Sequence, residues 1–167
     1  LFPDAHYVYL ARNPLHVFPS TVKLWRALYS TQGLHNPPRL DPWLDDYVLD
    51  MYARLTEAYE EDRHLIPENH LVELRYEDFV KDPVATMRDI YAKLRIEGFA
   101  KAEGPMREFL DERSEHQVSR YELPKSLKRK VIVRLKPYID RFGYREAVTR
   151  ELAKGAASKP VPEPQPS

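Results

Sequence analysis

The sequence contains no cysteine, which excludes disulfides, cysteine-ligated zinc and thiol chemistry. Only five of its 167 residues are glycine, and they are not clustered as a glycine-rich phosphate-binding loop requires. Neither sign of charge is in excess, because 26 Lys and Arg balance 26 Asp and Glu, so bulk charge is not expected to attract nucleic acid or anionic membranes. No run of about 18 apolar residues occurs, so we expect no membrane-spanning segment.

The residues that are present favour a globular domain. Hydrophobic residues make up 43% of the chain and aromatic residues 11%, which is enough for a core, and the length favours one domain. We place this domain at residues 1–154 and expect residues 155–167, which are rich in proline, to form a disordered tail. The chain starts without Met just before a strand-like segment, which predicts an N-terminally truncated domain.

Two short apolar segments predict strands. Residues His6–Ala11 form a near-continuous apolar run, typical of a strand covered on both faces, and residues His70–Arg75 form a second candidate. Two helical segments separate these strands, which indicates a parallel sheet with crossover connections. The sequence therefore predicts an α/β fold.

Helix starts are marked by a capping residue followed by proline. Asn13 and Pro14 predict a helix that runs to about Gly33, either kinked at Pro19 or restarting there. The pair Asp82–Pro83 gives the same signal. Further helices are predicted over residues 43–66, 83–94, 105–113 and 125–142, the last bent at Pro137.

A candidate anion site lies at the end of the first predicted strand. Arg12 stands at its carboxyl end, directly before a helix, where open α/β sheets bind ligands. Ser20 follows eight residues later, so that a guanidinium group and a hydroxyl group could converge on one phosphate. The alternative is that Arg12 pairs with a surface carboxylate and that Ser20 is merely exposed.

These residues resemble a known motif. The motif consists of a predicted strand followed by Arg12–Pro14 and, eight residues after Arg12, by Ser20. This order is similar to the 3'-phosphate-binding motif of sulfotransferases that use 3'-phosphoadenosine-5'-phosphosulfate (PAPS). The segment LRYEDFVKDP, residues 74–83, resembles the Tyr-Glu-Asp segment of that family, and FGYRE, residues 142–146, resembles the C-terminal ends of bacterial and Golgi-type members. The resemblance implies a three-layer, P-loop-type parallel sheet with flanking helices, here as a helix-rich C-terminal fragment.

The resemblance also implies roles for individual residues. Arg12 and Ser20 match the pair that binds the 3'-phosphate of PAPS or of its product, 3'-phosphoadenosine-5'-phosphate (PAP). Tyr76 matches a tyrosine near the adenine, the alternative being a core tyrosine with a satisfied hydroxyl group. Arg120 is a further phosphate candidate, the alternative being an exposed loop arginine. Glu77–Asp78 are expected to pair with basic neighbours or to cap the turn, and no metal site is expected.

Part of the family's machinery has no counterpart in this sequence. The loop with Gly, Lys and Thr that holds the 5'-phosphosulfate is missing, and the catalytic residues, including the base, are unknown. We therefore expect sulfuryl transfer from PAPS to a hydroxyl or amine in the family's reaction, but no transfer by these 167 residues alone. The rival functions are a nucleotide kinase-like P-loop fragment and a non-catalytic helical interaction module.

The partners and the compartment are less constrained. The acceptor could be a small molecule, a glycan, a lipid or a protein, because acceptor pockets are built from variable loops. No nucleic acid is expected as a partner, and the sequence does not specify an oligomeric state. A cytoplasmic location is the default expectation, with the Golgi lumen as the alternative if an anchor precedes this chain.

Overall fold

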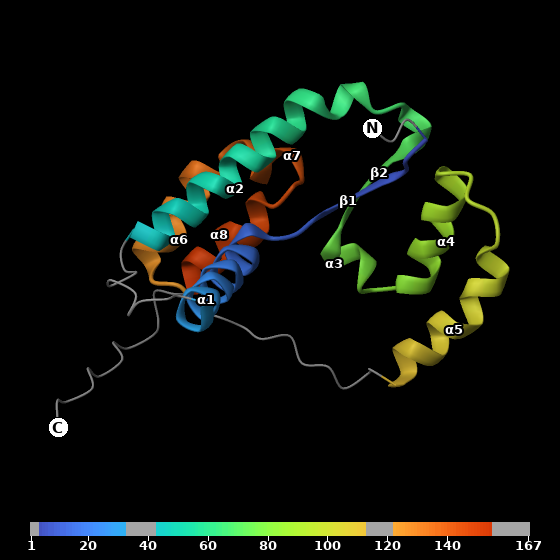
Figure 1. Ribbon diagram of the computed structural model, residues 1–167. Coiled ribbons are helices and arrows are strands. Elements are labelled where there is room, and N and C mark those ends of the chain that lie inside the picture. Colours follow the sequence, from blue (N-terminus) through green and yellow to red (C-terminus); the bar gives the residue numbers. More distant parts are fainter. Residues whose placement is uncertain (1–3, 33–42, 113–121, 155–167) are drawn as a thin grey trace. The chain divides into compact units, whose positions relative to one another are not determined.

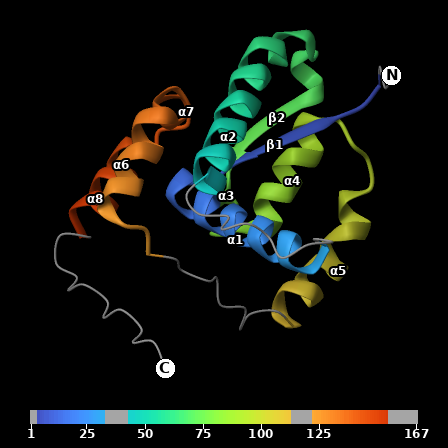
Figure 2. The ribbon, with the colours of Figure 1, turned by 60° about the vertical axis from the view of Figure 1, so that its left-hand side comes forward.

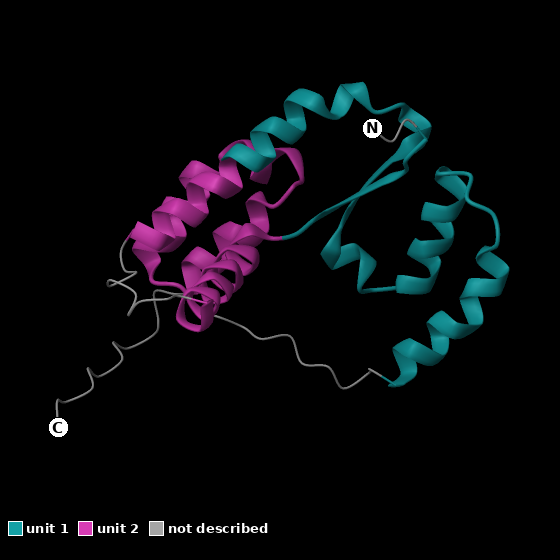
Figure 3. Ribbon diagram, viewed as in Figure 1, with its two compact units in different colours: residues 1–12, 54–120 teal, residues 13–53, 121–167 magenta. Residues whose placement is uncertain are grey.

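The computed structural model describes residues 4–32, 43–112 and 122–154 (Figure 1). The chain divides into two compact units, coloured separately in Figure 3. Unit 1 comprises residues 1–12 and 54–120, and unit 2 comprises residues 13–53 and 121–167. The helix α2, Trp43–Asp62, contributes its first part to unit 2 and its last part to unit 1.

Unit 1 contains both strands and the shorter helices around them. Its other elements are β1 (Tyr7–Ala11), the 3-10 helices η1 (Arg63–Leu65) and η2 (Glu68–His70), β2 (Leu71–Arg75), α3 (Tyr76–Phe79), α4 (Pro83–Lys93) and α5 (Phe99–Glu112). Unit 2 is helical, and besides the start of α2 it contains α1 (Pro14–Gln32), α6 (Lys125–Arg134), α7 (Lys136–Arg141) and α8 (Arg145–Lys154).

The strands β1 and β2 form a parallel pair. Their register runs from Tyr7 opposite Leu71 to Ala11 opposite Arg75, and the strands lie side by side in Figures 1 and 2. Within the described ranges the sheet has these two strands. Both predicted strands and their parallel pairing are therefore confirmed, and the fold is a helix-rich α/β arrangement.

Helices pack against both faces of this sheet. Val72 of β2 forms a buried cluster with Ile90 and Leu94 at the end of α4. Successive side chains of a strand point to opposite faces of the sheet, so Tyr9 lies on the face opposite Val72. On that face the ring of Tyr9 stacks on the ring of Tyr59 from α2, with 3.9 Å between the ring centroids. One face of the sheet is thus held by α4, and the other by the last part of α2, which belongs to unit 1.

The expectation that the first strand is covered on both faces is wrong for this chain. Tyr7, Val8 and Leu10 are 44%, 49% and 48% exposed. In the described part of the chain β1 pairs on one side only, and the apolar cluster under α4 centres on Val72 of β2. A continuous apolar pattern indicates that β1 could be buried on both faces. The strands and helices that pack against β1 determine how much of it is buried.

Both predicted helix caps are present. The Asn13 Oδ1 atom accepts a hydrogen bond from the Leu15 backbone N–H at 3.0 Å, and the Asp82 Oδ1 atom accepts one from the Ala85 N–H at 3.0 Å. The helix α1 does not restart at Pro19, which is buried inside a continuous helix. One proline removes a single backbone donor, which the remaining hydrogen bonds of a long helix tolerate.

Other helix boundaries differ from the predictions. The helix α5 starts at Phe99, six residues before Pro105, which lies inside it. The predicted bend at Pro137 is a break between α6 and α7 at Leu135, and this places Pro137 in the first turn of α7, where a missing N–H costs nothing. The helix α8 was not predicted. None of the helices in the described ranges is both long and apolar enough to cross a membrane.

Unit 2 is held together by a helical core. The helix α6 lies against α1 and α8. The most deeply buried side chains of this core are Leu15, Phe18, Leu44, Val131, Leu135 and Tyr144, each at most 1% exposed. The position of α1 is therefore set by α6 and by the C-terminal helices rather than by local sequence alone.

The last turn of α7 contains a carboxylate, Asp140, whose pKa is shifted. Hydrogen bonds from Arg145 and Lys136 lower the pKa of Asp140 from 3.8 to about 2. Because the pKa is lower in the folded chain, this contribution to stability is complete above the unfolded value and is lost as the pH falls from about 4 toward about 2. Carboxyl NMR titration should give a midpoint near 2 for Asp140.

The Asp140→Asn variant is the control for this titration. Above pH 5 it should unfold more easily than the parent chain, and the difference should disappear as the pH falls through about 2. A difference in stability that stays constant between these pH values would contradict the assignment.

Candidate functional site

The parallel register brings Arg12 and Tyr76 together. Ala11 and Arg75 are the last paired residues of β1 and β2, so the next residues leave the sheet at the same carboxyl edge. The Arg12 Cζ atom lies 4.2 Å from the centroid of the Tyr76 ring, and both residues are half-buried. This is a cation–π contact at the edge of the sheet where α/β proteins bind ligands.

The contact suits the binding of an anion. Stacking engages the face of the guanidinium group, whereas its N–H donors lie in its plane. A stacked arginine is therefore held in position while its planar fork keeps the geometry that recognises phosphate or carboxylate groups. Tyr76 is half-buried, so it is not a fully buried core tyrosine. Its ring packs on the Arg12 guanidinium group.

An acidic residue next to this edge has a structural partner. The Lys81 Nζ atom donates to the Asp78 Oδ1 atom at 2.6 Å, and the Arg75 Nε atom lies 3.8 Å from Oδ2. The hydrogen bond from Lys81 lowers the pKa of Asp78. The prediction that Asp78 pairs with basic neighbours is confirmed.

Ser20 is an exposed residue of α1 in unit 2, while Arg12 belongs to unit 1. Its hydroxyl group donates to the Val17 carbonyl oxygen at 2.8 Å, as serines in helices commonly do. A hydroxyl group in this position retains acceptor capacity and can donate to a phosphate only by rotating away from Val17. Arg120 lies outside the residues that the structure describes.

A polar cluster around the buried Asn13 at the start of α1 was not predicted. Asn13 is only 3% exposed, and its Nδ2 atom donates to the Glu151 Oε1 atom of α8 at 2.9 Å. The His16 Nε2 atom lies 2.9 Å from the same oxygen. The sequence indicated that Asn13 caps the helix, but gave no signal for Glu151, because α8 itself was not predicted.

A second polar cluster lies on the sheet face opposite α4. The Tyr59 hydroxyl group donates to the Glu73 Oε1 atom at 2.8 Å, and Arg63 is 3.6 Å from the Oε2 atom. Burial, followed by the hydrogen bond to Glu73, raises the pKa of Tyr59 well above its usual range. Tyr59 therefore stays protonated and fixes the end of α2 on β2.

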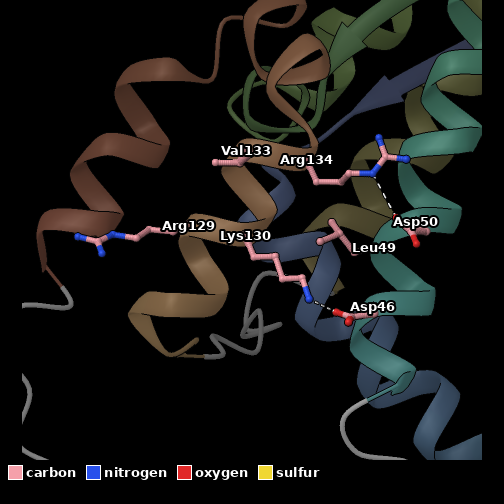
Figure 4. A pocket seen from close by; sticks show the side chains of 7 residues that line it. All are labelled: Asp46, Leu49, Asp50, Arg129, Lys130, Val133 and Arg134. Atoms are coloured by element: carbon pink, nitrogen blue, oxygen red, sulfur yellow. Dashed lines mark hydrogen bonds and ion pairs between the residues drawn. The ribbon is translucent and has the colours of Figure 1, made fainter.

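Unit 2 also has a surface hollow of about 470 Å³ between α2 and α6 (Figure 4). Two of its basic side chains meet acidic partners across the hollow: Lys130 pairs with Asp46, and Arg134 pairs with Asp50 at 3.2 Å. These pairings offset the positive charge that an anion would need. Across residues 4–32, 43–112 and 122–154, no group of three or more His, Asp or Glu side chains is placed to hold a metal ion.

Comparison with known proteins gives a consistent result. A family model described as the sulfotransferase family matches residues 1–101. The chain is 33% identical over 144 residues to omega-hydroxy-beta-dihydromenaquinone-9 sulfotransferase Stf3 of Mycobacterium bovis and, equally, to that of Mycobacterium tuberculosis. The match covers 86% of this chain and 37% of each relative. No solved structure matches the chain significantly.

Proposed function

The chain belongs to the sulfotransferase family, and from this premise we propose that it carries the part of a PAPS-dependent sulfotransferase that binds the 3'-phosphate of the donor. In this proposal Arg12 and Ser20 hold the phosphate and Tyr76 lies near the adenine. The complete reaction moves a sulfuryl group to a hydroxyl or amine and releases PAP. The P-loop-type, three-layer architecture of the family is part of the proposal.

One observation carries the proposal for the site: Arg12 is stacked on Tyr76 at the carboxyl edge of β1 and β2. The chemistry of this pair fits the 3'-phosphoadenosine end of PAPS, because a guanidinium group recognises a phosphate and an aromatic ring packs on a base. Family membership alone would leave open which residues bind the donor. The contact supports the choice of Arg12, because it involves a cation at the carboxyl edge of β1 and β2.

Bound PAPS supplies the sulfuryl group, and the residues of this chain bind and orient it. Arg12 contributes a permanent positive charge, and its ring contact limits the number of conformations that phosphate binding must select. Ser20 contributes a hydroxyl donor once it rotates from Val17. Arg120 remains a predicted additional ligand of the same phosphate.

The acceptor is proposed from the relatives. Stf3 is named for its action on omega-hydroxy-beta-dihydromenaquinone-9. A hydroxyl group on a lipid-soluble quinone is therefore the acceptor that the comparison favours among the small-molecule, glycan, lipid and protein alternatives. The kinase-like alternative is not favoured, because the family match is to sulfotransferases.

The proposed site is tested by comparing nucleotides that differ only in the 3'-phosphate. Isothermal titration of the full chain should give a dissociation constant for PAP at least about tenfold lower than that for adenosine 5'-phosphate, since hydrogen bonds to charged groups each contribute about 1.5–3 kcal/mol. Equal affinities for both nucleotides would contradict a 3'-phosphate site.

A further inference from the structure

Asn13, the residue after Arg12, forms hydrogen bonds with both polar atoms of its side chain. The Asn13 Oδ1 atom accepts from the Leu15 N–H at 3.0 Å, which caps α1, and the Nδ2 atom donates to the Glu151 Oε1 atom at 2.9 Å. Helix capping uses only the side-chain oxygen of asparagine. In an exposed asparagine the side-chain NH2 group would donate its hydrogen bonds to water. Asn13 is instead 3% exposed, so Glu151 satisfies a buried donor.

One oxygen atom of Glu151 is contacted by two nitrogen atoms of other side chains. The His16 Nε2 atom also lies 2.9 Å from the Glu151 Oε1 atom, so that the cap residue and the first turn of α1 share one carboxylate. A carboxylate near the start of a helix also interacts favourably with the helix dipole. The acceptor oxygen thus fixes which end of the Asn13 amide faces the Leu15 N–H.

The helix that carries Glu151 is anchored in unit 2. Val148 of α8 is 3% exposed, and the Lys128 Nζ atom of α6 donates to the Glu151 carbonyl oxygen at 3.1 Å. The backbone of Glu151 is therefore fixed on α6, and its side chain reaches α1. These contacts, all within unit 2, connect the C-terminal helix to the start of α1.

We propose that Glu151 is a positioning residue for the phosphate-binding turn Arg12–Pro14. It acts through Asn13. The hydrogen bond to Glu151 orients the Asn13 side chain, and the oriented side chain caps the start of α1. Because Arg12 is covalently bonded to Asn13, a fixed Asn13 backbone limits the conformations of the Arg12 backbone. This inference rests on the proposed function, because it assigns Glu151 to the same 3'-phosphate site. It gives the unpredicted helix α8, which lies beyond the family match, a part in donor binding.

The experiment compares two substitutions of Glu151 with a matched control. Glu151→Leu removes the acceptor, and Glu151→Gln keeps an oxygen that accepts from both Asn13 and His16. Glu146→Leu on the same helix is the control, because the Glu146 side chain is 91% exposed. Dissociation constants for PAP and adenosine 5'-phosphate are measured by titration for each variant of the 167-residue chain.

We expect Glu151→Leu to weaken PAP binding by about tenfold and to leave adenosine 5'-phosphate binding nearly unchanged. Glu151→Gln and Glu146→Leu should bind PAP like the parent chain. A purely stabilising role would not produce selective loss of the 3'-phosphate preference with rescue by Gln.

Asn13→Ser provides the second variant in case Glu151→Leu does not fold. Serine keeps a cap acceptor for the Leu15 N–H but lacks the amide nitrogen that donates to Glu151, and its hydroxyl group is one bond closer to the backbone than that nitrogen. It should lose PAP preference as Glu151→Leu does, while the Leu15 amide stays protected in hydrogen exchange. If the parent chain prefers PAP and both variants keep that preference, the positioning role is wrong and the 3'-phosphate site stands. If the parent chain shows no preference, the proposed function fails, and the role assigned to Glu151 fails with it.

Discussion

Replacing Arg12 by alanine is expected to weaken PAP binding about ten- to hundredfold, because the substitution removes a charged donor worth about 1.5–3 kcal/mol. It also removes the contact 4.2 Å above the Tyr76 ring. The affinity for adenosine 5'-phosphate should hardly change. Titration calorimetry of the parent chain and the variant with both nucleotides measures this difference directly.

Three further variants sharpen this test. Arg12→Lys keeps the charge but loses the planar fork, so it should fall between the parent chain and Arg12→Ala. Ser20→Ala should cost less than Arg12→Ala, because it removes a neutral donor. Arg107→Ala removes an exposed arginine of α5 that pairs with Glu103 and should leave PAP binding unchanged. Equal losses for both nucleotides would show that Arg12 supports structure rather than the 3'-phosphate.

Truncating Leu15 to alanine is expected to destabilise unit 2 by about 2–5 kcal/mol, the cost of a cavity in a packed core. Leu15 is 1% exposed in α1. Since domains of this size are stable by only about 5–15 kcal/mol, the loss is a large fraction of the total. Urea unfolding followed by circular dichroism should show a clearly lower midpoint.

Leu24→Ala is the matched control, because it makes the same substitution on the same helix at a side chain that is 57% exposed. Its effect should stay within about 0.5 kcal/mol. Comparable destabilisation by both substitutions would contradict the burial pattern of α1.

Local features of the chain were predictable. Asn13 and Asp82 are followed by proline and cap α1 and α4 as expected, because a cap depends on residues within one turn. The two strands and their parallel pairing followed from apolar runs separated by helices. Arg12 was recognised at the end of a strand, and the pairing of Asp78 with Lys81 follows from neighbours in the sequence.

Features that depend on distant partners were predicted less well. The exposure of Val8 and Leu10 could not be read from an apolar pattern, because that pattern is the same whether or not a further layer is present. The helix α8 lacks a strong capping signal and is held by burial of Val148. Without α8, Glu151 could not be identified as the partner of Asn13.

The sequence by itself determined the strands, the starts of α1, α2, α4 and α6 and the presence of a cation at a strand end, because these depend on propensities and caps within a few residues. Only the tertiary structure decided that Arg12 stacks on Tyr76 and that Asn13 binds Glu151. The first contact requires the register that aligns Ala11 with Arg75, and the second requires α8 to pack on α6. Both are set by packing between segments far apart in the chain, where spacing in the sequence carries no information about distance in space.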